Sequence, residues 1–217
     1  MIDVRMFTVG VIQENCFFVR QPNADTAVIV DPGEEPDKLL DALKALNIDN
    51  VDAILLTHTH FDHIGAVAPV AKATGAPVYC PELETQVLAN IMAYVPWPGF
   101  GPYESYEADH TVKGGETLTL AGLTFDVIFT PGHSPGHVTY AVKDEGSLFS
   151  GDVLFQGSVG RVDLPGGDWP TLLNSIETLL RTHPPKTTVY PGHMGITTLG
   201  AERETNPFLR ELAQTNR

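Results

Sequence analysis

The sequence predicts an α/β protein built as a four-layer sandwich, in which two β-sheets pack face to face and helices cover both outer sides. The first observation is the order of elements: strand-like segments precede a helix-like one, and this order returns in the second half of the chain. The second is composition, because 42% apolar and 18% charged residues are ordinary for a globular protein. No linker-like segment divides the 217 residues, so we expect one domain over residues 1–217.

The first half begins with three predicted strands, at residues 4–10, 16–20 and 26–30, which are rich in β-branched and aromatic side chains. Residues 31–48 are predicted to be helical, because leucines recur there at helical spacing. A buried strand is expected at residues 52–56, a helix at 64–74 that ends before Gly75, and a short strand at 77–80.

The second half begins with an irregular segment, because residues 91–110 contain prolines, glycines and aromatic side chains without a period. Such a loop is either a lid over a site or a surface excursion packed on its own aromatic side chains, and the sequence leaves both open. Antiparallel strands are then predicted within 117–130 and 137–152, a helix at 168–184, a strand at 187–193 and a final helix at 199–214.

The chain is strongly acidic, with a formal net charge of −14. Such a field repels nucleic acid, and no lysine or arginine cluster offers a local exception, so we expect no nucleic-acid partner. The longest apolar runs are strand-sized, and the first ten residues lack the layout of a secretory signal. We therefore expect a cytoplasmic protein without a membrane span. Cys16 and Cys80 are expected to be buried and unpaired.

Four side chains that bind metals fall within six positions of the segment THTHFDH, residues 57–63. The segment follows a predicted buried strand, and residues two apart on extended chain point the same way, so His58 and His60 can bind one ion. Asp62 and His63 lie where a helix is expected to begin, and they can serve a second ion. Imidazole and carboxylate donors suit zinc, iron or manganese.

Three further donors each follow a predicted strand: His133 in FTPGHSPGH, Asp152 in LFSGD and His193 in VYPGH. A Pro-Gly pair forms a tight, stiff turn, which presents the next residue at the edge of a sheet. The sequence therefore predicts a metal site assembled from several strand ends.

Together these motifs resemble the metallo-β-lactamase superfamily of hydrolases, and more narrowly its glyoxalase II (hydroxyacylglutathione hydrolase) branch. The resemblance runs from Asn15 and Cys16 through DPG at 31–33 to TLGAERETNPFL at 198–209, so it covers almost the whole chain. The segment GRVDLPGGD at 160–168 resembles the short, single-domain bacterial members. Full-length glyoxalase II adds a C-terminal helical domain that helps to hold glutathione, and we expect this chain to lack it.

The resemblance implies an αββα sandwich and two divalent ions, with zinc expected and iron or manganese as alternatives. A metal-bridging hydroxide would attack a thioester carbonyl, and Asp62 and Asp152 would be the catalytic carboxylates. By position, the first ion would take His58, His60 and His133, the second Asp62, His63 and His193, with Asp152 as the bridge.

Several neighbouring polar residues receive supporting roles. Asp31 and the threonines at positions 57 and 130 are candidates for hydrogen-bond partners that orient the histidines, although Asp31 is equally placed to cap the next helix. In the family pattern His137 is structural and not a ligand. The remaining histidines, His110 and His183, are expected to be exposed.

The substrate expected from the resemblance is a small thioester, glutathione-linked or not. Arg161 is the candidate substrate-binding residue, since its guanidinium can pair with a carboxylate. Asp163 stands where the family has tyrosine, which disfavours an anionic glutathione tail, and Arg161 can instead pair with that aspartate. Residues 91–110 are candidates for covering the acyl group. The sequence leaves open whether the protein is a monomer or a homodimer.

Other activities share these motifs. A persulfide dioxygenase would hold one iron through His58, His133 and Asp152, and lactone and phosphodiester hydrolases use the same scaffold. A true β-lactamase is less favoured, because those enzymes generally carry cysteine where Asp152 stands. A metal-binding regulatory module is the non-enzymatic alternative.

Overall fold

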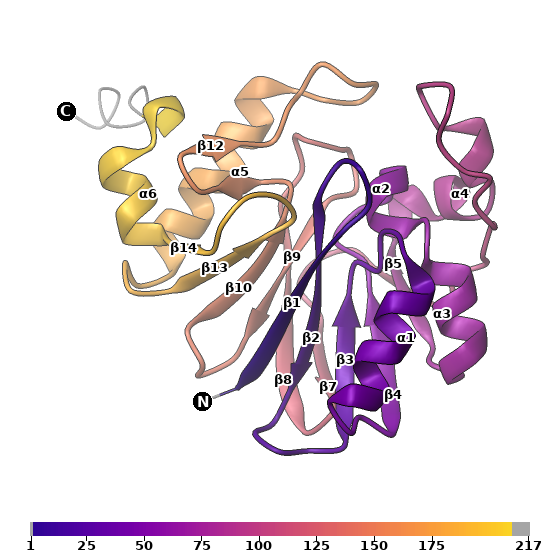
Figure 1. The fold of residues 1–217 in the computed structure, drawn as a ribbon. Helices are drawn as coiled ribbons and strands as arrows, with labels where there is room; N and C mark the ends of the chain where they lie inside the picture. Colours follow the sequence, from indigo (N-terminus) through magenta and orange to yellow (C-terminus); the bar gives the residue numbers. More distant parts are fainter. Residues whose placement is uncertain (1, 210–217) are drawn as a thin grey trace.

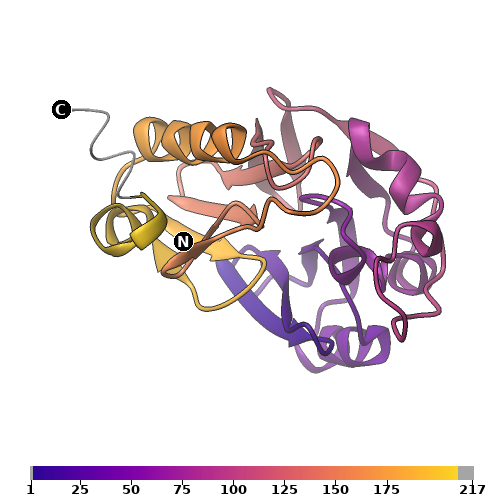
Figure 2. The ribbon, with the colours of Figure 1, turned by 90° about the horizontal axis from the view of Figure 1, so that it is seen from above.

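The protein is a four-layer sandwich in which two six-stranded sheets pack face to face between outer layers of helices (Figure 1). The computed structural model describes residues 2–209. Viewed from above, α5 and α6 lie on one outer side and the helices of the first half lie on the other (Figure 2). The αββα fold class predicted from the sequence is confirmed.

The first sheet has the order β1-β2-β3-β4-β5-β6, antiparallel from β1 to β3 and parallel from β3 to β6. Its strands are β1 (Asp3–Val9), β2 (Glu14–Arg20), β3 (Thr26–Val30), β4 (Asn50–Leu55), β5 (Val78–Pro81) and β6 (His110–Val112). The helical segments of this half are α1 (Pro36–Ala45), α2 (Phe61–Ile64), α3 (Val67–Thr74), η1 (Glu82–Glu84), α4 (Thr85–Leu88) and η2 (Ile91–Ala93).

The second sheet has the order β14-β13-β10-β9-β8-β7, and only the pairing of β10 with β13 is parallel. Its strands are β7 (Thr117–Leu120), β8 (Leu123–Phe129), β9 (Val138–Val142), β10 (Ser147–Gly151), β13 (Thr188–Pro191) and β14 (Thr197–Thr198). A small hairpin and the outer helical segments complete this half: β11 (Leu154–Phe155), β12 (Ser158–Val159), α5 (Trp169–Thr182), α6 (Leu199–Thr205) and η3 (Pro207–Leu209).

Three apolar cores separate the four layers. Alternate residues of β2 point to opposite faces of the first sheet, so Phe17 joins the core between the sheets while Phe18 joins the core under the helices. The Phe17 ring lies 5.4 Å from that of Phe149 on the second sheet. Truncating so buried an aromatic side chain costs roughly 3–5 kcal/mol, and the two sheets therefore form one rigid scaffold.

Several boundaries differ from the sequence prediction. The helix predicted at 64–74 begins only at Val67, as α3, because the chain turns after Ile64, where the separate short helix α2 (Phe61–Ile64) ends. The final helix ends at Thr205, and the part of its predicted range at 210–214 lies outside the described residues. Within 91–110, regular structure is confined to η2 and the first residue of β6.

Both cysteines are buried and free, as predicted. Within residues 2–209, none of the helices has the length and apolar character that crossing a bilayer requires.

Candidate metal centre

The ligand candidates follow four strands that end at the same side of the sandwich. The segment with His58 and His60 follows β4, His133 follows β8, Asp152 follows β10, and His193 follows β13. The structure brings all seven predicted residues into two adjoining clusters, which are His58, His60 and His133, and Asp62, His63 and His193, with Asp152 between them.

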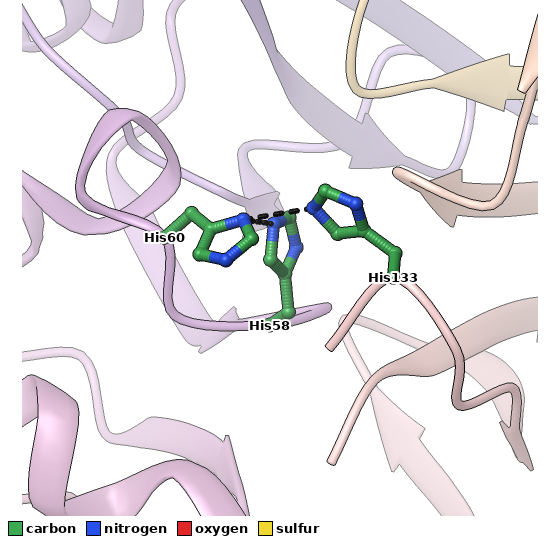
Figure 3. A group of neighbouring side chains, drawn as sticks. All are labelled: His58, His60 and His133. Carbon is green, nitrogen blue, oxygen red and sulfur yellow. Dashed lines mark hydrogen bonds between the residues drawn. The ribbon is translucent and has the colours of Figure 1, made fainter. Parts of the chain in front are cut away.

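The first cluster consists of three imidazole rings whose nitrogens converge on one point (Figure 3). His60 Nδ1 lies 2.8 Å from His133 Nε2 and 3.2 Å from His58 Nε2. Burial, together with the neighbouring His63 and His60, holds the pKa of His58 well below its usual value, and burial beside His133 lowers the pKa of His60 to about 4. These two rings are neutral at neutral pH, which is the form that binds metal.

The far nitrogens of these rings are already engaged. His133 Nδ1 donates to the backbone carbonyl of Arg161 at 2.7 Å, which leaves Nε2 without a proton in the neutral ring. Thr57 Oγ1 donates to Asp31 at 2.6 Å and so accepts from His58 Nδ1 at 3.1 Å. The Nε2 atoms of His58 and His133 therefore both direct an unprotonated lone pair toward the same point, where the two lone pairs repel each other. A cation bound at that point would remove the repulsion. The donor set fits a divalent ion.

Asp152 joins the two clusters. One carboxylate oxygen lies 3.3 Å from His63 Nε2, and the other lies 3.4 Å from His133 Nε2 and 3.6 Å from His193 Nε2. His193 Nε2 is also 3.3 Å from an oxygen of Asp62. His63 Nε2 and Asp152 Oδ1 are buried and face each other at 3.3 Å, and neither forms a hydrogen bond to any other described residue, so both atoms are also available to an ion.

Two histidines of the first cluster have lowered pKa values, whereas both histidines of the second cluster have raised ones. Burial acts against a charged His63, but the Asp152 carboxylate and its hydrogen bond raise the pKa of His63 well above its usual value. The pKa of His193 is raised in the same way, against burial, by Asp152 and Asp62. Burial alone would raise the pKa of Asp152, but His193 and His63 bring it well below its usual value. In the second cluster the carboxylates therefore favour positive charge, which is the environment that a cation would take.

Two glycines make room for Asp152. Gly151 has a φ of +47°, and a Cβ on it would lie 2.3 Å from Thr57 Oγ1 and 2.6 Å from His137 Nε2. A Cβ on Gly192 would lie 2.4 Å from Asp152 Oδ1. The glycines of the SGD and PGH motifs are therefore required by close packing around Asp152 and its neighbours, in addition to their turns.

The supporting residues are partly those predicted. Asp31 accepts from the backbone and hydroxyl of Thr57 and contacts His63 Nδ1 at 3.1 Å, so it orients the ligand segment and does not cap α1, whose N-cap is Glu35. Thr130 contacts His137 at 3.1 Å, not a ligand. His137 Nε2 in turn accepts from the backbone nitrogen of Asp152 at 3.1 Å, which gives it the predicted structural role.

The other two histidines lie away from the centre. His110 is exposed on β6, as expected. His183 was expected to be exposed, but it is partly buried at the end of α5, where its Nδ1 lies 3.3 Å from the carbonyl of Leu179.

Glu84 is a buried carboxylate that the sequence analysis missed. It accepts from the backbone of Thr59 at 2.7 Å, from the Thr59 hydroxyl at 2.9 Å, from the backbone of Gly136 at 2.8 Å and from the Ser134 hydroxyl. Thr59 stands between His58 and His60, while Ser134 follows His133. Glu84 therefore ties together the two segments that carry the first cluster, and a single glutamate outside any motif gave no signal of this.

Glu14 is a second residue that was missed. It is buried beside the second cluster, its Oε1 lies 3.8 Å from His63 Nδ1, and neither oxygen has a hydrogen-bond partner among the described residues. Burial raises its pKa well above the usual value, because loss of water disfavours the charged carboxylate.

A pocket of about 900 Å³ opens over the two clusters and is lined by His60, Asp62, His133, Asp152 and His193. Tyr94 and Trp97 of the predicted loop also line it, and so does Arg161. The guanidinium of Arg161 forms two hydrogen bonds of 2.6 Å to Asp163, which is the pairing that the sequence left open as an alternative.

Comparison with known proteins agrees with this geometry. Residues 9–193 match the family described as the metallo-beta-lactamase superfamily. The chain is 42% identical over 210 residues to the probable metallo-hydrolase YqgX of Bacillus subtilis, covering 94% of this chain and 96% of the relative. It is 33% identical over 221 residues to the hydroxyacylglutathione hydrolase GloC of Haemophilus influenzae, covering 96% and 98%.

Solved structures of the same fold are similar along the whole chain. The BLEG-1 B3 metallo-beta-lactamase is 41% identical with a TM-score of 0.89, covering 95% of this chain and 99% of that protein. TTHA1623, solved in a di-iron-bound form, is 42% identical with a TM-score of 0.84, covering 94% and 100%.

Proposed function

The chain belongs to the metallo-beta-lactamase superfamily of metal-dependent hydrolases, and from this premise we propose that it hydrolyses small thioesters such as S-D-lactoylglutathione with two divalent ions. The observation that carries the proposal is the position of Asp152, whose two oxygens reach histidines of both clusters. A carboxylate in that position suits a pair of ions better than one.

In this proposal, His58, His60 and His133 would hold the first ion, Asp62, His63 and His193 would hold the second, and Asp152 would serve both. Zinc is the ion we expect, and iron or manganese suits the same donors. The similarity to TTHA1623 in its di-iron-bound form supports a pair of ions and keeps iron among the candidates.

The reaction follows from the arrangement over the clusters. Bound divalent ions would supply a Lewis acid for the carbonyl oxygen and lower the pKa of bound water towards neutrality. Asp62 and Asp152 both line the pocket and are the carboxylates that orient the attacking water. Cys16 and Cys80 are buried away from the pocket, so neither is placed to form an acyl intermediate. In this proposal water is the nucleophile: its oxygen bonds to the acyl carbon, the carbon–sulfur bond breaks, and the proton lost by water ends on the leaving thiol.

A thioester is favoured as substrate because of the relative GloC, whose name as a hydroxyacylglutathione hydrolase denotes a thioester activity in a chain of matching length. The pocket of about 900 Å³ is ample for a small acyl group and its thiol.

The test is hydrolysis of S-D-lactoylglutathione by the metal-loaded protein, by protein stripped with a chelator, and by the stripped protein after metal is restored. We expect turnover to disappear with the metal and to return with it. Asp152→Asn keeps the shape of the bridge but removes its charge, and it should lower kcat by at least tenfold. Full turnover after verified metal removal would refute the proposal.

A β-lactam is the second candidate substrate, because BLEG-1 is 41% identical along nearly the whole chain. A chromogenic cephalosporin in the same assay decides between the two, since the preferred substrate has the higher kcat/KM. The one-iron dioxygenase alternative needs only His58, His133 and Asp152, and the complete second cluster favours the two-ion hydrolase over it. Lactones and phosphodiesters belong in the same panel.

A further inference from the structure

Large apolar side chains are exposed around the mouth of the pocket. Leu83, Tyr94, Trp97 and Met194 all line it, and their exposed fractions are 68%, 50%, 40% and 55%. The first three come from the segment after β5, and Met194 comes from the loop between β13 and β14. Apolar side chains that face water together around a cavity mark a ligand site, because covering them is favourable.

We call Leu83, Tyr94, Trp97 and Met194 the apolar wall. Aromatic packing supports this wall at Trp97. The Phe61 ring lies 6.1 Å from Trp97, 4.9 Å from Phe100 and 5.9 Å from Tyr103. Phe61 immediately precedes Asp62 at the centre, so the loop that carries Trp97 is packed directly against the ligand segment. The wall is therefore in place before substrate arrives, which lowers the entropic cost of binding.

Electrostatics on the same side of the pocket disfavour an anionic substrate. Of the described residues that line the pocket, Arg161 alone carries a permanent positive charge. Its guanidinium is 5.7 Å from the centre of the Trp97 ring, and both of its hydrogen bonds are to Asp163. That bonding lowers the pKa of Asp163 to about 2, so the pair is ionised and has no net charge at neutral pH.

Taking the thioesterase activity proposed above as its basis, we propose that this pocket selects thioesters whose thiol arm is neutral and apolar, and that Asp163 disfavours anionic arms such as that of glutathione by neutralising Arg161. A small acyl group over the clusters leaves most of a pocket of about 900 Å³ to the thiol arm. That arm then lies against Trp97 and Arg161, where it finds apolar surface and no unpaired cation among the described lining residues.

Three lactoyl thioesters with the same acyl group test this selectivity: those of benzyl mercaptan, N-acetylcysteamine and glutathione. The metal-loaded protein should hydrolyse the benzyl thioester with a kcat/KM at least about tenfold above that of the N-acetylcysteamine thioester, as burial of one ring provides. The glutathione thioester should still be hydrolysed, as the proposed activity requires, but as the poorest of the three. A best rate with glutathione, or equal rates with all three, would overturn the selectivity. Hydrolysis of none would instead overturn the proposed thioesterase activity.

Substitution of Trp97 in the apolar wall tests whether this ring contacts the apolar thiol arm. Trp97→Ala should lower kcat/KM for the benzyl thioester by about tenfold and change that for the glutathione thioester much less. Phe129→Ala is the control, because Phe129 is equally exposed, at 45%, on β8 and does not line the pocket. An equal loss with both thioesters in Trp97→Ala would show that the ring does not act through the apolar arm.

The role of Asp163 is tested by a substitution that should improve binding of the glutathione thioester. Asp163→Asn frees the Arg161 guanidinium and should lower KM for the glutathione thioester by about threefold to tenfold, with a smaller change for the two neutral thioesters. Adding Arg161→Met to Asp163→Asn should abolish the gain. An unchanged KM for glutathione in Asp163→Asn would refute the role given to Asp163.

Discussion

Replacing Glu84 by glutamine tests how the first histidine cluster is held. The Glu84 carboxylate accepts hydrogen bonds on both oxygens, from Thr59 on one and from Ser134 and Gly136 on the other. A glutamine side chain has the same shape but replaces one oxygen by an NH2 group, which cannot accept. Whichever way the amide turns, a buried backbone N–H, of Thr59 or of Gly136, faces another donor.

The expected loss of metal affinity follows from the hydrogen bond that Glu84→Gln removes. A hydrogen bond to a charged acceptor contributes about 1.5–3 kcal/mol, and a buried donor without a partner adds a cost of similar size. Part of this cost moves the segments that carry His58, His60 and His133. Loss of such a supporting contact typically weakens metal affinity by about 10- to 100-fold. We expect a Kd change of that size for Glu84→Gln, measured by competition with a chromophoric chelator.

Glu202→Gln is the matched control. Glu202 is also buried, and it accepts from the backbone of Gly157 at 2.8 Å, from Thr197 at 2.6 Å and from Asn206 at 2.8 Å, none of which is a ligand candidate. Both variants should unfold at a lower temperature, by about 2–4 °C per kcal/mol for a chain of this size. Only Glu84→Gln should weaken metal binding. Equal metal affinity in the two variants would refute the positioning role of Glu84.

Three further predictions concern protons, the bridge and the thiols. The pKa values of His63 and His193 are both raised, so these rings keep their protons to higher pH than free imidazole and compete with metal for them. Calorimetry in buffers of different ionisation enthalpy should detect proton release on metal binding, and the affinity of the second cluster should fall as pH is lowered. His137→Phe removes the acceptor of the Asp152 N–H and should cost about 1–3 kcal/mol of unfolding free energy in chemical denaturation, while an unchanged midpoint would contradict the hydrogen bond. Cys16 and Cys80 should react with a thiol reagent only after denaturation, because both are buried and burial raises the pKa of both thiols. Rapid labelling of the native protein would contradict their burial.

The fold could be predicted because its signals are local. Apolar and β-branched segments of strand length alternate with amphipathic ones, and the Pro-Gly turns mark where strands end. The strand β13 was predicted, but the two-residue strands β11, β12 and β14 escaped prediction, because such short strands form only where a neighbouring backbone offers partners. The break after Ile64 also escaped it, since the turn there depends on packing against residues distant in sequence.

The seven ligand candidates could be predicted because each follows a strand in a recognisable motif, and the structure brings them together. Their partners could not. His133 is oriented by a backbone carbonyl, that of Arg161, and every residue has a carbonyl, so no side chain signals the contact. Glu84 acts through tertiary contacts with Thr59, 25 positions away, and with Gly136, 52 positions away. Long-range pairing of this kind leaves no periodicity in a single sequence.

The central claim is that two ions, joined by Asp152, hydrolyse a thioester. The most direct test adds metal in steps to stripped protein and follows S-D-lactoylglutathione hydrolysis against metal equivalents per chain. We predict that turnover rises chiefly with the second equivalent and levels off at two. Full turnover at one equivalent, with no further change at two, would contradict the account.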